Sequence, residues 1–184
     1  MSSLAGFIAR LTQALDELGL SYMFVGSIAS SVHGSPRSTQ DVDIVVTLSI
    51  QDALALVARF PDDRYYVSVE AAREAVLRRS SFNIIDFESG WKADLLVTRP
   101  RDFSRTEMTR RQQADLLGVR TWVASPEDTI LAKLEWAKLA GGSARQRDDV
   151  IGIVTTQGSA LDLAYLSRWA AELGLEREWA ELSP

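Results

Sequence analysis

The chain has 184 residues, of which 46% are hydrophobic and 24% are charged, a composition that fits a globular protein of one domain or of one domain with a helical appendage. It contains no cysteine, which excludes disulfides and thiolate metal sites, and no apolar run long enough to span a membrane. Its formal charge of −5 gives no overall attraction to nucleic acid, and its N-terminus lacks the basic region of a signal peptide, so we expect a cytoplasmic protein without a membrane partner.

Hydrophobic periodicity and turn residues predict the elements of the first half of the chain. Apolar residues from Leu4 to Leu18 recur at helical spacing and end at Gly19, and later apolar runs bounded by polar residues are typical of strands. The expected elements are helices over 4–18, 27–32, 51–60 and 68–79, strands over 22–25, 42–46 and 65–67, and a polar loop over 33–40.

The second half of the chain changes from strands to helices at Ser125. Ser125 and Pro126, followed by two acidic residues, have the pattern of a helix start. The expected elements are a hairpin of strands over 81–87 and 92–97, a second hairpin around 116–124, helices over 125–140 and 147–154, and one or two more helices within 161–182.

These elements predict an α/β fold, or α+β in stricter terms, with a small mixed sheet flanked by helices. We assign residues 1–124 to a catalytic domain and residues 125–184 to a C-terminal helical extension packed on it. The sequence has no internal repeat and no clear flexible linker between the two parts.

The segment with the most chemistry joins Gly26 and Ser27 to Asp41 and Asp43. Glycine lets the backbone approach a ligand closely, and a serine at a helix start leaves free N–H groups suited to a phosphate. Aspartates at i and i+2 of a strand point to the same face, where their oxygens suit a hard divalent cation. A buried strand rarely tolerates unpaired carboxylates for structural reasons alone, which favours a phosphate-and-metal site.

This pattern resembles the nucleotidyltransferase superfamily, which has the polymerase beta-like fold. The matching residues are Gly26, Ser27, Asp41 and Asp43, and the resemblance covers roughly the first 125 residues and, more loosely, the helical tail. The family has a third carboxylate on a later strand. Asp94, in the sequence Lys-Ala-Asp-Leu-Leu, is our assignment.

Asp86, in Ile-Ile-Asp-Phe, is the rival to Asp94 for the third carboxylate. Asp94 also has an alternative interpretation, that of an exposed acid on a half-buried strand.

Four further residues resemble nucleotide-binding positions of the family. Arg37 and Thr39 precede the aspartate pair as an Arg-x-Thr, although loops also use such residues for turns. Lys133, after Pro126, resembles the helical lysine of abortive-infection nucleotidyltransferases, with Asp149 on the next helix completing the site. The alternative is a solvated lysine and an ordinary acid in the first turn of a helix.

The resemblance implies transfer of a nucleoside monophosphate from ATP or another NTP to an acceptor hydroxyl. Asp41, Asp43 and Asp94 would hold two Mg²⁺ ions, with Mn²⁺ as a substitute. The acceptor would be an RNA or tRNA end or a protein side chain, with a small molecule such as an aminoglycoside ranked behind them. A toxin–antitoxin role with a cognate toxin or antitoxin protein is one form of this function, and a non-catalytic nucleotide- or protein-binding module is the alternative.

Two groups of large or charged side chains remain. Five arginines between Arg99 and Arg111 form a candidate phosphate-binding patch for an RNA acceptor. Trp136, Trp169 and Trp179 fit helical packing better than base stacking.

Overall fold

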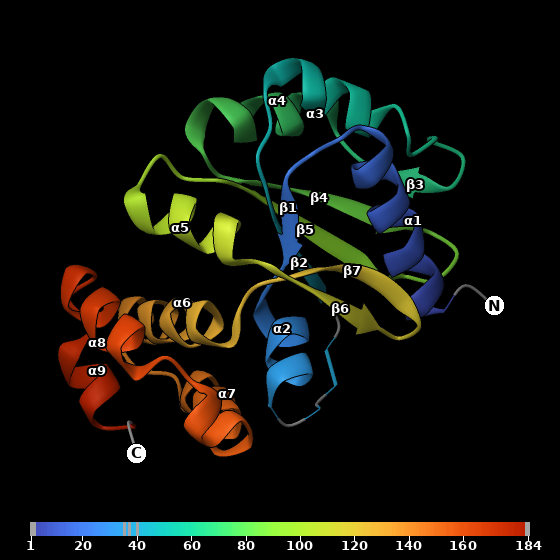
Figure 1. Cartoon of the computed structure of the whole chain (residues 1–184). Coiled ribbons are helices and arrows are strands. Elements are labelled where there is room, and N and C mark those ends of the chain that lie inside the picture. Colours follow the sequence, from blue (N-terminus) through green and yellow to red (C-terminus); the bar gives the residue numbers. More distant parts are fainter. Residues whose placement is uncertain (1–2, 35, 37, 40, 183–184) are drawn as a thin grey trace.

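The computed structural model describes residues 3–34, 36, 38–39 and 41–182, and its centre is a seven-stranded mixed sheet (Figure 1). The strand order is β3-β4-β5-β2-β1-β7-β6, with β2 parallel to β5, β1 parallel to β7, and the other neighbours antiparallel. The strands are β1 (Tyr22–Phe24), β2 (Asp41–Val46), β3 (Tyr65–Tyr66), β4 (Ser81–Asp86), β5 (Lys92–Val97), β6 (Gln112–Leu116) and β7 (Val119–Val123). The expected mixed sheet flanked by helices is confirmed.

The two faces of the sheet differ because side chains alternate along each strand. In β2, Val42, Ile44 and Val46 are fully buried, whereas Asp41 and Asp43 on the other face are only partly buried. The same alternation in β5 buries its apolar residues on the first face and leaves the second face partly open. The sheet therefore has one apolar core face and one face available for a site.

Three helices cover the core face. Apolar residues of α1 (Leu4–Glu17), α3 (Ile50–Val57) and α4 (Val69–Arg78) join the buried strand residues in one hydrophobic cluster. Each helix begins at a serine whose side chain accepts a backbone N–H, and Ser49 with Asp52 completes a reciprocal capping box on α3. These local signals explain why the sequence positions of these helices were predictable.

The helices of the tail have their own hydrophobic cluster, which Phe103 of α5 (Asp102–Arg110) also joins. Figure 1 shows α6 to α9 gathered at one side of the molecule, next to α2 and α5. The helices are α2 (Gly26–His33), α5 (Asp102–Arg110), α6 (Pro126–Leu139), α7 (Ala144–Gln157), α8 (Leu163–Glu172) and α9 (Glu176–Ala180), with a short 3-10 turn η1 (Gly158–Ala160). The boundary at residue 124 stays a prediction.

Helix α2 connects the sheet to the tail. A Cβ on Gly34 would lie 2.8 Å from the backbone nitrogen of Ile153, so α2 and α7 approach more closely there than another residue would allow. Gln157 donates to the carbonyl of His33 over 2.7 Å, and His33 Nε2 lies 2.6 Å from the carbonyl oxygen of Ala124. These contacts hold the tail helices against the helix that follows the glycine turn.

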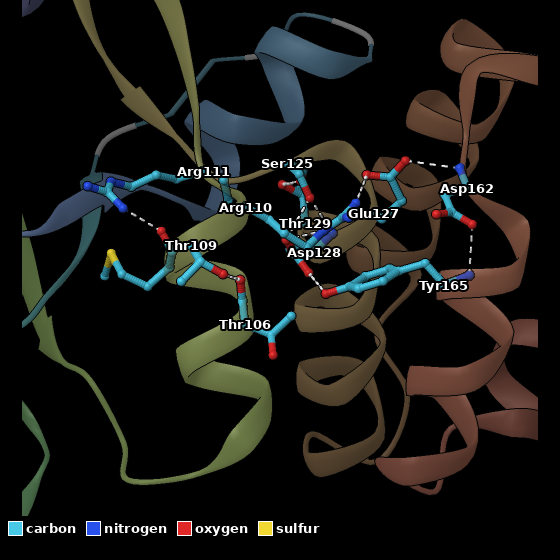
Figure 2. Close-up of polar contacts among 12 residues, drawn as sticks. Thr106, Thr109, Arg110, Arg111, Ser125, Glu127, Asp128, Thr129, Asp162 and Tyr165 are labelled. Carbon is cyan, nitrogen blue, oxygen red and sulfur yellow. Dashed lines mark hydrogen bonds and ion pairs between the residues drawn. The ribbon is translucent and has the colours of Figure 1, made fainter.

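A polar network joins α5, α6 and α8 (Figure 2). Tyr165 donates to Asp128 over 2.6 Å, and the backbone N–H of Asp162 donates to Glu127 over 3.0 Å. Arg110 pairs with Glu127 at 3.1 Å and lies over the Tyr165 ring, 3.8 Å from its centroid. Burial raises the pKa of both the Asp128 carboxyl and the Tyr165 phenol.

Most predicted elements occur within a few residues of their expected limits, one helix was not predicted, and one expectation is wrong. The segment 102–110, which the sequence indicates only as part of a basic patch, forms helix α5. Trp169 and Trp179 are buried as expected, whereas the Trp136 side chain is 61% exposed and does not serve helical packing. In the part of the chain that the structure describes, no helix combines the length and apolarity needed to cross a membrane.

Candidate active site

The glycine turn after β1 is shaped by Asp43. Gly26 has φ +61, in the left-handed region, and a Cβ at this position would lie 2.9 Å from Asp43 Cγ and closer still to its Oδ2. The backbone N–H of Val25 also donates to the carbonyl of Asp43 over 2.9 Å. Only glycine satisfies both the conformation and the space, because other residues rarely adopt a positive φ and all carry a Cβ. The start of α2 therefore lies directly against the Asp43 carboxylate.

Strand register brings the predicted carboxylates together. Asp43 pairs with Asp94, and Asp41 pairs with Lys92, across the parallel neighbours β2 and β5. Paired residues of adjacent strands share a face and lie about 5 Å apart. The three aspartates therefore share the open face of the sheet. Their role as metal ligands stays a prediction.

Asp86 lies on the other face of the sheet. Asn83 is the β4 residue that pairs with Asp94, and Asp86 is three positions later, so its side chain points to the opposite side. It is completely buried and accepts from Arg10 over 2.6 Å, with Arg64 at 3.7 Å. These contacts give Asp86 a structural role and separate it from the Asp43 face.

The acidic face carries a lysine that the sequence reasoning missed. The ammonium of Lys92 lies 3.0 Å from Asp94 Oδ2 and 3.5 Å from Asp41 Oδ1. Burial raises the pKa of the Asp43 carboxyl, as do Asp94 and Asp41, while Lys133 and Lys92 partly oppose that rise. Lys92 lies two residues before Asp94 on the same strand, and residues i and i+2 share a face. This spacing could have predicted from the sequence that Lys92 lies on the acidic face.

A polar cavity of about 410 Å³ opens beside Asp41 and Asp43. Thr39 lines it and donates from Oγ1 to the carbonyl of Asp41 over 2.9 Å, while Arg37 lies outside the described residues. Two residues at the start of α7 also line it and were not predicted. The full lining is Ser27, Ser38, Thr39, Asp41, Asp43, Arg145 and Gln146.

Lys133 and Asp149 meet in the tail. The Lys133 ammonium lies 2.6 Å from Asp149 Oδ2 and donates to Gln146 Oε1 over 2.9 Å, and Lys133 is only 5% exposed. The interpretation of Lys133 as a solvated lysine is therefore wrong. A spacing of one helical turn between Gln146 and Asp149 places both on the face of α7 that meets Lys133.

A second cavity of about 410 Å³ lies between the open face of the sheet and the tail, and we call it the sheet–tail cavity. It is lined by the ends of β1, β2 and β5, by α5 and α6, and by Gln146 of α7. Asp43 and Lys133 line it, as do Glu107 of α5 and Trp136 of α6. Because Ser27, Asp43 and Gln146 line both cavities, the two spaces meet at the glycine turn.

The arginines of the 99–111 segment are largely engaged inside the protein. Arg101 binds Glu135 through two hydrogen bonds of 2.5 and 2.8 Å, and Arg105 pairs with Asp102. Arg110 belongs to the network of Figure 2, and Arg111 stacks on Trp122 at 4.6 Å from the ring centroid. These contacts reduce the positive charge that the segment can offer to phosphates.

Comparison with known proteins adds the fold class. No protein-family model matches the sequence, and a search of curated proteins finds no match. In structure, the chain is similar to ANT(2″)-Ia in complex with adenylyl-2″-tobramycin, with a TM-score of 0.60 at 15% identity over 91% of this chain and 94% of that one. An antigenic nucleotidyltransferase-like protein from Paracoccidioides brasiliensis gives a TM-score of 0.55 at 19% identity, over 91% and 89%.

Lincomycin-bound LnuA, a lincosamide antibiotic adenylyltransferase, gives a TM-score of 0.51 at 11% identity, covering 77% of this chain and 90% of its own. At these identities the likeness identifies the fold. The chain has the nucleotidyltransferase fold, as the resemblance of its motif implied.

Proposed function

We propose that this protein is a nucleotidyltransferase that moves a nucleoside monophosphate from an NTP to an acceptor hydroxyl. The observation that carries the proposal is the pairing of Asp43 with Asp94 at a glycine turn that has no room for a Cβ. That arrangement concentrates negative charge beside the start of a helix, where a triphosphate and its cations would meet. Two proteins of the same fold, ANT(2″)-Ia and LnuA, are linked by their names to adenylyl transfer.

The carboxylates of the open sheet face have the donor chemistry of a divalent cation site. Asp41, Asp43 and Asp94 supply the hard oxygen donors that Mg²⁺ prefers, and their mutual repulsion contributes to the raised pKa of Asp43, which a cation would offset. Within the described residues, no three acidic or histidine side chains already form a metal-binding group. Lys92 lies between Asp41 and Asp94 instead, so metal binding requires its ammonium to move.

The donor chemistry therefore fits Mg²⁺ or Mn²⁺ held by Asp41, Asp43 and Asp94. When bound, such ions neutralise the triphosphate and lower the proton affinity of the acceptor hydroxyl. The protein's own residues position the reactants: the start of α2 at Gly26 and Ser27 offers backbone N–H groups to phosphate oxygens. Arg145 and Lys133 add positive charge at the two cavities that meet there.

In the proposed reaction, the acceptor oxygen forms a bond to the α-phosphorus while the bond to the pyrophosphate oxygen breaks. The hydroxyl proton passes to a base, and Asp94 is the candidate because it lies beside Asp43 on the same face. Positioning of the two reactants supplies much of the acceleration. Thr39, and Arg37 by family resemblance, would contact the triphosphate side.

The possible biological roles differ in the molecule that accepts the nucleoside monophosphate. An RNA end or a protein side chain would suit a toxin–antitoxin role with a cognate protein, and a small molecule would suit the sheet–tail cavity. The experiment is to incubate the protein and Mg²⁺ with each α-labelled NTP and with tRNA, lysate proteins or small polyols, and to follow the label.

We expect the label to leave the NTP for one acceptor class with release of pyrophosphate. Asp43→Asn should abolish transfer, and Asp102→Asn, which removes an exposed acid, is the matched control. NTP binding without transfer to any acceptor would favour the non-catalytic nucleotide-binding module, and no NTP binding at all would exclude nucleotidyl transfer and leave only a protein-binding module.

A further inference from the structure

Lys92 lies among the carboxylates of the open sheet face, and the proposed transfer gives this lysine no task of its own. It pairs with Asp41 across β2 and β5 and lies two residues before Asp94, so the three side chains point to the same side of the sheet. Its ammonium lies 3.0 Å from Asp94 Oδ2 and 3.5 Å from Asp41 Oδ1. One ammonium therefore bridges the two strands that carry the acids.

The lysine and the acids form a group of four side chains with one positive member. Asp43 pairs with Asp94 across the strands and lies two residues after Asp41, so strand register places Lys92 at the fourth position of the group. The ammonium offsets the charge of one carboxylate, and the group keeps a net negative charge. Carboxylates that share a face repel one another, so the bridge holds Asp41 and Asp94 closer than they would otherwise stay.

The ammonium contacts the carboxylates that a divalent cation would use. Mg²⁺ binds carboxylate oxygens at about 2.1 Å, so an ion held by Asp41 and Asp94 would lie where the Lys92 ammonium lies between them. The two cations have charges of the same sign and cannot share these oxygens without repulsion. Binding of the metal and pairing of the lysine therefore weaken each other, and this coupling is reciprocal.

The polar cavity beside Asp41 offers the displaced ammonium another partner when phosphate is bound there. Asp41 lines this cavity and is one of the two acids that Lys92 contacts, so the ammonium lies next to the cavity wall. Ser27 at the start of α2 and Arg145 of α7 also line it, and both suit phosphate oxygens. Lysine carries its charge on a flexible four-carbon stem, so its ammonium can move from a carboxylate to a phosphate without a change in the strand.

We propose that Lys92 is a positioning residue that holds Asp41 and Asp94 as an internal counter-ion, and that a divalent cation displaces it when a phosphate-bearing ligand accepts its ammonium. The inference rests on the proposed function, because it concerns the same carboxylates. A divalent cation should then bind weakly by itself and more tightly together with a triphosphate. Lys92 thereby suppresses loading of the site by metal without nucleotide.

The first test measures Mn²⁺ binding to the full chain without nucleotide, by paramagnetic titration. Lys92→Met keeps an unbranched side chain and removes the charge, so it should bind Mn²⁺ about ten- to a hundredfold more tightly than the wild type, within the range typical of coupling between two sites. Lys92→Arg keeps the charge and should bind as weakly as the wild type. Lys138→Met is the matched control, because it removes the same charge from a side chain that is 49% exposed and lies 3.9 Å from Glu178, and it should also bind like the wild type.

A second test follows the lysine itself by NMR. The chain has three lysines, Lys92, Lys133 and Lys138, so protein labelled with ¹³C at the lysine Cε atoms gives three signals, which Lys92→Met and Lys138→Met assign. With Mg²⁺ alone, the Lys92 signal should shift only at high concentration. With inorganic triphosphate added, it should shift at a lower Mg²⁺ concentration, while the Lys138 signal stays in place.

The proposal is overturned if Lys92→Met binds Mn²⁺ no more tightly than the wild type, or if Lys138→Met gains as much affinity. It is also overturned if the Lys92 signal responds to Mg²⁺ equally with and without triphosphate. None of these outcomes decides the proposed function, which is read from the movement of the nucleotide label. Label transfer by the wild type, together with unchanged Mn²⁺ affinity in Lys92→Met, would leave nucleotidyl transfer intact and remove only the counter-ion role of Lys92.

Discussion

Replacing Gly26 with alanine tests the glycine turn on which the candidate site depends. The new Cβ would lie 2.9 Å from Asp43 Cγ, so the Asp43 carboxylate must move, and the residue must keep φ +61. The left-handed backbone costs about 1–2 kcal/mol for a residue with a Cβ. For a chain of this length that cost lowers the melting temperature by only a few degrees.

The displacement of Asp43 should cost far more in function than in stability. A reactive group misplaced by about 1 Å can reduce a rate about a hundredfold. We therefore expect Gly26→Ala to remain folded, to lose at least about a hundredfold in nucleotidyl transfer, and to bind Mn²⁺ more weakly in a paramagnetic titration.

Gly19→Ala is the matched control for the backbone effect. Gly19 has φ +63, nearly the same as Gly26, but no atom lies within 4 Å of the position that an added Cβ would take. It should lose the same ~1–2 kcal/mol and keep wild-type transfer and Mn²⁺ affinity. The reasoning is refuted if Gly26→Ala transfers label normally, or if Gly19→Ala loses activity to the same extent.

Three further predictions concern charged residues. Asp94→Asn should weaken Mn²⁺ binding in a titration with little change in stability. Asp86→Asn should lower the free energy of unfolding by ~3 kcal/mol in denaturant titrations without changing Mn²⁺ binding, because it breaks a buried ion pair with Arg10. The reverse result would exchange the two roles. Lys133→Ala should cost ~3 kcal/mol, because it removes the ammonium that pairs with the buried side chain of Asp149. Lys133→Met with Asp149→Asn should recover most of that stability but not NTP affinity, and unchanged NTP affinity would give the pair a purely structural role. Because burial raises the pKa of Glu107 from 4.5 to about 7 on folding, the folded protein binds more protons than the unfolded chain between these pH values. The free energy of unfolding should therefore fall by up to ~3 kcal/mol as pH rises through that window. Glu107→Gln should flatten this slope in denaturant titrations, and an unaltered slope would contradict the burial argument.

The carboxylate face was predictable because its signals are local. The period of two in β2 places Asp41 and Asp43 together, and this depends only on strand geometry. The choice of Asp94 over Asp86 needed more, because both lie in apolar runs of similar composition. Strand register places Asp94 beside Asp43, while Asp86 lies on the opposite face and meets Arg10, which is 76 positions away in the sequence. The metal-binding role of Asp94 stays a prediction.

Burial in the tail was less predictable, for a different physical reason. A single apolar stripe implies that the rest of a helix is solvated, which was the basis for the solvated interpretation of Lys133. Helix α6 instead contacts α2, α7, α8 and α9, so acids and a lysine are buried on more than one of its sides. Helix α5 was missed because few of its residues are apolar, and its inner face includes the buried Ser104 and Glu107.

The same long-range pairing changes the interpretation of the arginines in the 99–111 segment. From sequence alone, the arginines of 99–111 suggested a surface for RNA, because charges in sequence are counted without their partners. In the structure Arg101 is held by Glu135 and Arg110 by Glu127, so acids of α6 offset part of the positive charge of the segment. Glu107 lies between these two arginines in sequence and forms an ion pair with neither of them. The arginine content of 99–111 therefore does not by itself predict an RNA-binding surface, because acids from a distant helix offset part of its charge.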